Sequence, residues 1–328
     1  MRRREVIALL GAAVAAWPLK ARAQQPALPV VGFIRIGSAE ANARNVAAFR
    51  KGLGETGYIE GQNVAVDYHW LEDHYDRVPA VLADLVRRQV AVIALPGNTP
   101  AALAAKAATA TIPIVFGVTE DPVRLGLVAS LAQPGGNATG INFFVNEVVA
   151  KRLQLLHELV PKAVRIAVLV NPANAANTEA TLRDVREAAP AIGLQIQVLN
   201  ATTIGEIDAA FASFADKRPD ALFVGGNAFF TDRRVQFATL TARYGIPATY
   251  AQNDFVAAGG LMSYGTDLAD TFHQVGVYTG QILKGAKPAD LPVLQSTKFA
   301  FALNLQTARA LGIAVPPGLL SIADEVIE

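Results

Sequence analysis

After Pro29 the sequence alternates short runs of β-branched and other apolar residues with longer segments that have helical periodicity. The run at 30–34 predicts a strand, and 42–56 predicts a helix whose apolar residues fall on one face and which stops at Gly57. The same strand and helix pattern continues almost to the end of the chain. Such alternation is typical of βαβ units and parallel sheets, so the chain is predicted to be an α/β protein.

The pattern restarts after a turn at 134–137, which indicates a second lobe. About 300 residues follow the first 23, more than one hydrophobic core usually holds, and this also favours two lobes. The predicted strands of the first lobe are 30–34, 64–68, 90–95 and 114–116. Those of the second lobe are 166–170, 195–199, 221–224 and 248–250.

One further unit follows the second lobe: a strand at 261–264, a helix at 268–283 and a strand at 299–303. It fits if the chain returns to the first lobe for that helix and then goes back to the second. The expected architecture is therefore two Rossmann-like lobes with parallel sheets, joined by a hinge that the chain crosses three times. The expected division is a leader at 1–23, a first lobe at 24–141 plus 265–293, and a second lobe at 142–264 plus 294–328.

The first 23 residues have the pattern of a cleaved secretory signal. Arginines at 2–4 precede an apolar run at 6–17 that is too short to span a bilayer, and small residues at Ala21 and Ala23 suit cleavage before Gln24. The consecutive arginines leave the twin-arginine export route open beside the general one. The expected location is the periplasm.

Charge and cysteine content exclude several classes of function. The leader carries five of the 29 Lys and Arg and one of the 28 Asp and Glu, so the remaining chain is mildly acidic. Without clustered basic residues, nucleic acid is not an expected partner. The absence of cysteine excludes thiol chemistry and thiolate metal sites.

Several segments resemble one family, the exported solute-binding components of bacterial ABC transporters with the type I periplasmic-binding fold, in the branch that includes tryptophan-type binding proteins. The segments are AWPLKARAQQ at 16–25, IPIVFGVTEDPVRLGLVASLAQPGGNATG at 112–140, VLVNPANAANT at 168–178, GGLMSYGTDLADTFHQVGVYTGQILKGAKPADLPV at 259–293, and ADEVIE at 323–328. The chain departs from the family at 69–74, where many relatives have a smaller segment that contains glycine and an Arg in place of His69.

The resemblance implies a two-lobed binder that closes over one small solute and delivers it to a membrane permease. It implies no catalysis and no cofactor. The implied partners are the small-molecule solute and the permease and ATPase subunits of an ABC importer in the inner membrane, and the protein is expected to be a monomer.

Open parallel sheets bind ligands beyond the carboxyl ends of their strands, where loops lead into helix N-termini. Two such edges are expected to face each other, with hinge residues between them. The candidate ligand-binding residues are Ser38, Asn98, Thr99, Thr119, Asp121, Asn142, Phe143, Asn171, Asn174, Asn227, Phe229, Tyr250, Asn253 and Tyr264.

Amide, hydroxyl and aromatic groups in these loops favour a small amphipathic solute, such as an amino acid or an aromatic carboxylate. A carboxylate would bind helix N–H groups and hydroxyls, an ammonium would face Asp121, and Phe143, Phe229 or Tyr264 would contact an apolar side chain. Structural interpretations remain open. Asp121 before a proline suits an N-cap, as do Ser38, Thr99 and Asn174, and adjacent Phe229 and Phe230 are expected to face different ways.

Two other functions fit parts of the sequence. His69, Glu72, Asp73 and His74 have the ligand types for a metal-dependent exported hydrolase, although the two histidines would not share a helix face. A ligand-sensing subunit for a membrane receptor would use the same fold as a transport component. Ser263 lacks the upstream glycine of a nucleophile elbow, because Leu261 stands there.

Overall fold

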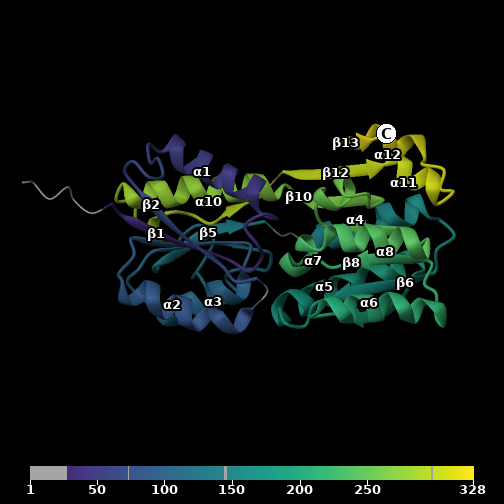
Figure 1. Ribbon diagram of the computed structural model, residues 1–328, viewed down its shortest axis with the longest axis horizontal. Helices are drawn as coiled ribbons and strands as arrows, with labels where there is room; N and C mark the ends of the chain where they lie inside the picture. Colours follow the sequence, from purple (N-terminus) through teal and green to yellow (C-terminus); the bar gives the residue numbers. More distant parts are fainter. Residues whose placement is uncertain (1–27, 73, 144–145, 297) are drawn as a thin grey trace, which may run out of the picture.

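The computed structural model describes residues 28–72, 74–143, 146–296 and 298–328, without the side chains of 146 and 147. The chain forms two α/β lobes that lie side by side along its longest axis (Figure 1). Each lobe is a mostly parallel sheet covered by helices on both faces. The predicted fold class is confirmed.

The first lobe contains, among the described residues, a six-stranded sheet in the order β11-β5-β4-β3-β1-β2, and every pair in it is parallel. Its strands are β1 (Val30–Arg35), β2 (Ala65–Trp70), β3 (Val92–Pro96), β4 (Ile114–Val118), β5 (Ala138–Asn142) and β11 (Leu294–Gln295). Its α-helices are α1 (Ala43–Glu55), α2 (Val78–Arg87), α3 (Thr99–Ala108) and α10 (Leu268–Leu283).

The second lobe contains, in the described part of the chain, a seven-stranded sheet in the order β13-β12-β10-β9-β8-β6-β7, in which only β10 and β12 pair antiparallel. Its strands are β6 (Arg165–Val170), β7 (Gln195–Asn200), β8 (Ala221–Val224), β9 (Ala248–Tyr250), β10 (Met262–Thr266), β12 (Phe299–Asn304) and β13 (Glu325–Ile327). Its α-helices are α4 (Asn146–Leu159), α5 (Ala175–Ala188), α6 (Ile204–Ala212), α7 (Ala228–Asp232), α8 (Arg234–Tyr244), α9 (Asp254–Ala257), α11 (Leu305–Ala310) and α12 (Pro317–Ser321).

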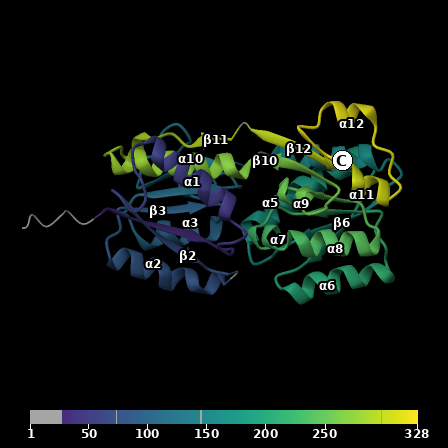
Figure 2. The same ribbon diagram turned by 45° about the horizontal axis from the view of Figure 1, so that its top comes forward.

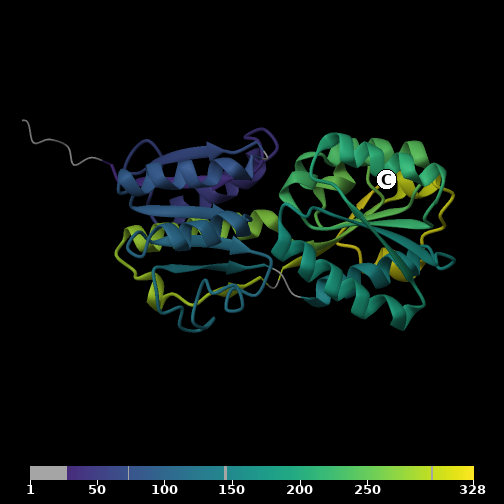
Figure 3. The same cartoon turned by 90° about the horizontal axis from the view of Figure 1, so that it is seen from below.

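Alternating residues of the buried strands contribute to two hydrophobic cores in each lobe. In β6, Ile166 and Val168 pack under the face that carries α4, whereas Ala167 and Leu169 pack under the face that carries α6 and α8. Such two-sided burial explains why these strands are almost continuously apolar. Figure 3 shows the helices on opposite faces of each sheet.

The chain passes between the lobes three times: after β5, between β10 and α10, and between β11 and β12. The described residues of these crossings are tied to one another. The Thr266 hydroxyl donates a hydrogen bond to the Phe143 carbonyl, and the Asp267 N–H donates to the Lys298 carbonyl at 3.1 Å. The crossings therefore form one connected hinge.

The strand pairing differs from the expected division of the chain at each of the three crossings. Asn142 was assigned to the second lobe but pairs with β4 in the first sheet, and Gly265 and Thr266 were assigned to the first lobe but pair with β12 in the second sheet. Leu294 and Gln295 were assigned to the second lobe, but they form β11 and pair with β5 in the first sheet. A two-residue strand has no periodicity to reveal it. The third crossing therefore begins after Gln295.

Helices α1 and α10, far apart in the sequence, pack together on one face of the first lobe (Figure 1). Glycines permit their close approach: a Cβ at Gly52 of α1 would lie 2.0 Å from the His273 carbonyl oxygen of α10. A Cβ at Gly276 of α10 would lie 2.1 Å from the Phe49 carbonyl oxygen. Through this contact α10 attaches the returning chain to the first lobe.

Two glycines of α1 provide a test of this packing. Gly52→Ala forces α1 away from α10, and we expect it to lower the free energy of unfolding by about 2 kcal/mol, as overpacking does. Gly54→Ala meets no atom within 4 Å, and the better helix propensity of alanine is expected to leave stability unchanged or raise it by up to about 1 kcal/mol. Urea denaturation measures both. Equal effects of the two substitutions would contradict the proposed role of Gly52.

Candidate functional site

A cavity lies between the two lobes, where the carboxyl ends of both sheets face each other. It holds about 850 Å³ of empty space, part of it open to solvent. The lining residues are Arg35, Gly97, Thr99, Thr119 and Leu268 of the first lobe, Phe143, Gly265 and Thr266 at the crossings, and Val148, Val149, Arg152, Asn174, Asn177, Thr181, Gly226, Asn227, Ala228, Thr231, Ala251 and Gln252 of the second lobe.

Asparagines that follow strands begin three of the helices at this cavity. The Oδ1 atoms of Asn98, Asn174 and Asn227 accept hydrogen bonds from N–H groups in the first turns of α3, α5 and α7, at 3.2, 3.3 and 2.9 Å. Asparagine is favoured at this position because its side chain satisfies an N–H that the helix leaves unpaired. The polar character of the cavity thus partly follows from how its helices start.

Five of the residues predicted from the sequence line the cavity: Thr99, Thr119, Phe143, Asn174 and Asn227. Four of them stand directly after strands or at helix starts, as the argument from strand ends required. Phe143 lies at the first crossing and is almost fully buried. The structure brings these residues together from both lobes.

Three other predicted asparagines are buried beside the cavity, outside its lining, and form hydrogen bonds with the loops that line it. Asn98 is buried at the start of α3, while Asn142 donates to the carbonyls of Val118 and Glu120, at 3.3 and 2.8 Å. Asn171 donates to Asn227 Oδ1 at 3.3 Å. They fix the loops that carry other lining residues.

Asp121, the expected partner of a solute ammonium, does not line this cavity. It lines a separate open groove, and its Oδ1 accepts hydrogen bonds from the N–H groups of Val123 and Arg124, at 2.9 and 3.3 Å. These bonds close a turn and do not cap a helix, because the described residues 122–126 form turns and no helix begins directly after Asp121. The described lining of the cavity contains no Asp or Glu.

Three predicted aromatic residues lie outside the cavity lining. Phe229 is buried beneath the Arg233 guanidinium, whose carbon lies 3.7 Å from the ring centroid. Tyr250 is fully buried and stacks on Phe255 at 4.4 Å between centroids. Tyr264 stacks on Phe299 at 6.2 Å, within the hinge. Of the predicted aromatic residues, Phe143 is therefore the one in the described lining of the cavity.

Two predicted residues make contacts at the edges of the lobes instead. The Ser38 N–H donates to Asp232 Oδ2 at 3.1 Å, which joins the first lobe to the second. Asn253 donates to Glu325 Oε2 at 3.2 Å within the second lobe. Ser38 thus lies at the contact between the lobes and Asn253 on the outside of the second.

The sequence interpretation missed two buried arginines of the lining, Arg35 and Arg152. Arg35 ends β1, and its guanidinium donates to Asn42 Oδ1 at 3.1 Å and to the carbonyls of Pro96 and Gly97, at 3.0 and 2.6 Å. Arg152 lies on α4. The available signal was its spacing, because Val149, Arg152 and Leu156 recur at the interval of an apolar helix face. A charged residue at a position on the apolar face of a helix is expected to be buried, and a buried charge indicates a binding or structural role.

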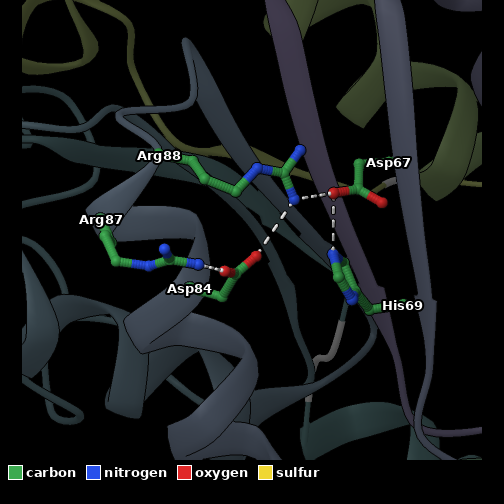
Figure 4. Close-up of polar contacts among 5 residues, drawn as sticks. All are labelled: Asp67, His69, Asp84, Arg87 and Arg88. Carbon is green, nitrogen blue, oxygen red and sulfur yellow. Dashed lines mark hydrogen bonds and ion pairs between the residues drawn. The ribbon is translucent and has the colours of Figure 1, made fainter.

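The histidine segment that could have held a metal ion makes other contacts, as Figure 4 shows in part. His69 Nε2 lies 3.2 Å from Asp67 Oδ2, and that carboxylate also accepts a hydrogen bond from Arg88 at 2.6 Å. His74 Nδ1 lies 3.6 Å from a different acid, Asp76. The two histidines therefore face separate carboxylates.

The Asp67 carboxylate serves as the partner of a cation. Burial raises the pKa of the Asp67 carboxyl, but the Arg88 hydrogen bond, with nearby His69, lowers it by more, so this pKa lies below its ordinary value. Arg88 also contacts Asp84 at 3.1 Å, and Asp84 pairs with Arg87 (Figure 4). Among the described residues no group of three or more His, Asp or Glu could hold a metal ion, and Asp73 lies outside them.

The two lobes touch across the mouth of the cavity. Besides the contact of Ser38 with Asp232, Asn177 donates to the Thr119 hydroxyl at 3.2 Å, and Arg44 lies 3.7 Å from Asp254. A Cβ at Gly37 would lie 1.9 Å from Asp232 Oδ2. These contacts exist only while the lobes are close together.

Comparisons with known proteins agree with this geometry. The model of a family described as ABC transporter substrate binding protein matches residues 30–327. A tyrosine-binding protein from Clostridioides difficile (strain R20291) is 27% identical over 264 residues, which cover 80% of this chain and 75% of that protein.

Two solved structures show different degrees of similarity at 25% identity. An ABC domain from Streptococcus pneumoniae in complex with L-Trp has a TM-score of 0.82, covering 92% of this chain and 100% of that one. A ligand-free, open substrate-binding protein with adhesive properties from Clostridium difficile has a TM-score of 0.64, covering 92% and 99%. Over the whole chain, the present structure is thus more similar to the L-Trp complex than to the ligand-free, open structure.

Gly37→Val is expected to hinder this closed arrangement. The added side chain occupies the position of the Asp232 carboxylate, so the carboxylate must move or the lobes must separate. We expect about tenfold weaker solute binding, equivalent to one lost hydrogen bond, with the unfolding free energy of the solute-free protein changed by less than about 0.5 kcal/mol. Calorimetric titration and urea denaturation measure these quantities. Gly205→Ala, which meets no atom within 4 Å, is the control, and equal affinity of both variants would exclude a role for the Gly37 contact.

Proposed function

Because the chain belongs to the family of ABC transporter substrate binding proteins, we propose that it captures a small amphipathic solute in the interlobe cavity and delivers it to a membrane permease. The proposed solute is an amino acid, especially an aromatic one, or an aromatic carboxylate. The observation that carries the proposal is a cavity, partly open to solvent, that residues of both lobes line with apolar and polar groups together.

The lining supports a solute with one apolar and one polar end. Phe143, Val148, Val149 and Leu268 supply apolar surface, and burying an aromatic ring against such groups contributes several kcal/mol. Amides, hydroxyls and Arg152 supply polar contacts that fix its orientation. The related proteins named for tyrosine and solved with L-Trp support the aromatic amino acids as first candidates.

Hinge closure supports capture as the mode of action. A solute that contacts both lobes binds the closed form more tightly and shifts the population toward it. The closed form then differs from the open one on its outer surface, which the permease can recognise. The partners in this proposal are the permease and ATPase of an importer, and the protein acts as a monomer.

Export places the protein where an importer needs it. The leader at 1–23 lies outside the described residues, and its pattern supports the periplasm as the location. Among the described residues no helix has both the length and the apolar character to cross a bilayer.

We expect N-terminal sequencing of the protein from the periplasmic fraction to begin at Gln24. Retention of 1–23 on the protein found there would contradict cleavage.

A thermal-shift screen tests the proposed solute class. We expect L-tryptophan, L-tyrosine or an aromatic acid such as benzoate to raise the melting temperature, because a solute that binds only the folded form adds about 2.7 kcal/mol of stability at one hundred times its dissociation constant. Glucose and inorganic phosphate serve as controls. The proposal fails if no amino acid or aromatic acid shifts melting at millimolar concentration, or if mass spectrometry shows that the bound compound is chemically altered.

A further inference from the structure

Arg152 is a buried cation in the wall of the cavity. It lies on α4, one helical turn after Val148 and Val149, and only 3% of it is exposed. Its guanidinium carbon lies 3.9 Å from the centroid of the Phe223 ring. The helix and this ring hold the charged group against the second sheet.

The hydrogen bonds of Arg152 are incomplete. A guanidinium has five N–H groups, yet the bond formed with the described residues is from Nη2 to the Val224 carbonyl at 3.0 Å. Nε is buried without an acceptor, and Arg152 forms no ion pair with a described carboxylate. Burial lowers the pKa of Arg152 to about 9, so the group still carries its charge at neutral pH.

Arg35, the other cation of the lining, differs in this respect. Its guanidinium donates to one side-chain oxygen and two backbone carbonyls. Those oxygens belong to the loops after β1 and β3, which Arg35 holds together. Arg35 therefore has a structural role in the first lobe, whereas the donors of Arg152 are not used up by the described chain.

A second unused donor lines the same cavity near the end of β8. Asn227 follows Val224 by three residues, and its Oδ1 accepts from the N–H of Phe229 and from Asn171. These two bonds fix the amide so that Nδ2 is left buried without an acceptor. Donors without acceptors are expensive inside a protein. Two of them in one cavity indicate that the missing group is an acceptor.

We propose that Arg152 and Asn227 bind the carboxylate of the solute, and that this contact makes the protein selective for carboxylic acids over their amides and amines. The inference rests on the proposed function, because it assumes a small solute in this cavity. A carboxylate brings both the charge that Arg152 lacks and oxygens for Nε and Nδ2. Val148 and Val149, on the preceding turn of α4, then face the apolar part of the solute.

Arg152→Met tests the contact while keeping the length of the side chain over Phe223. Calorimetric titration is done with two matched pairs, L-tryptophan with L-tryptophanamide and indole-3-propionate with indole-3-propionamide. We expect affinity for the acids to fall by about 100-fold, as when one partner of a buried charge pair is removed, and affinity for the amides to stay within about threefold. Arg165→Met is the control, because Arg165 begins β6 at the end of the strand that lies away from the cavity. It is expected to change neither the affinity for the acids nor the affinity for the amides.

The melting temperature of the solute-free variant separates this role from a structural one. Removing a buried, unpaired charge is expected to leave the melting temperature equal to or above that of the original protein. A structural arginine would instead lower it and would weaken acids and amides alike. That result would overturn the proposal.

Asn227 offers a second, independent variant. Asn227→Asp keeps the oxygen that caps α7 but replaces the Nδ2 donor by an anion, so it should weaken the acids more than Asn227→Ala does. Equal losses would exclude Nδ2 as a contact.

The outcomes distinguish this inference from the proposed function. If the original protein binds acid and amide of each pair equally, the carboxylate contact is wrong and solute capture still stands. If it binds none of the four compounds and no other amino acid or aromatic acid, solute capture itself is wrong, and the inference with it.

Discussion

The carboxyl ends of two parallel sheets face one another, and the function depends on this constraint. In a parallel sheet every strand delivers its following loop to the same edge. Because the chain crosses between the lobes three times, neither sheet can turn its loop edge away from the other. Loops after β3, β4, β6 and β8, separated by long stretches of sequence, therefore line a single cavity. The helices around each sheet stabilise this arrangement, and α4 together with the N-terminal parts of α3, α5, α7 and α10 contributes residues to the cavity lining.

The polar contacts between the lobes that the described residues make at the cavity are individually weak. The hydrogen bonds of Ser38 with Asp232 and of Asn177 with Thr119 each contribute about 0.5–1.5 kcal/mol, and the exposed pair of Arg44 with Asp254 contributes less than about 1 kcal/mol. When the lobes separate, these polar groups form hydrogen bonds with water, which offsets most of the free energy of the lost contacts. A solute that fills the cavity adds to them from both sides, so a modest intrinsic closure energy makes the equilibrium responsive to the solute.

Strand periodicity made the fold predictable, whereas the site was predictable only where it follows strand ends. The sequence predicted four lining residues correctly because the loops that follow parallel strands all lie at the same edge of the sheet. These residues are Thr99, Thr119, Asn174 and Asn227. Tyr250 and Phe229 were assigned to the cleft from similar positions, but whether an aromatic ring points outward or into the core depends on its neighbours. Phe255 stacks on Tyr250, and the Arg233 guanidinium covers Phe229. Their orientation is a tertiary effect that one strand cannot reveal.

Arg152 was missed because it lies within helix α4 and not after a strand. The position of this helix beside the hinge also relates solute binding to closure of the lobes. Net charge and the loops that follow strands do not reveal a cation that a helix carries into the cavity wall. Its helix α4 begins directly after the first crossing, where the Thr266 hydroxyl of the second crossing holds the Phe143 carbonyl. Phe143 and Thr266 lie in the wall of the same cavity as Arg152. Arg152 and the hinge are therefore parts of one cavity wall, and in the proposed complex a carboxylate that neutralises the buried cation would stabilise the closed lobes beside the hinge.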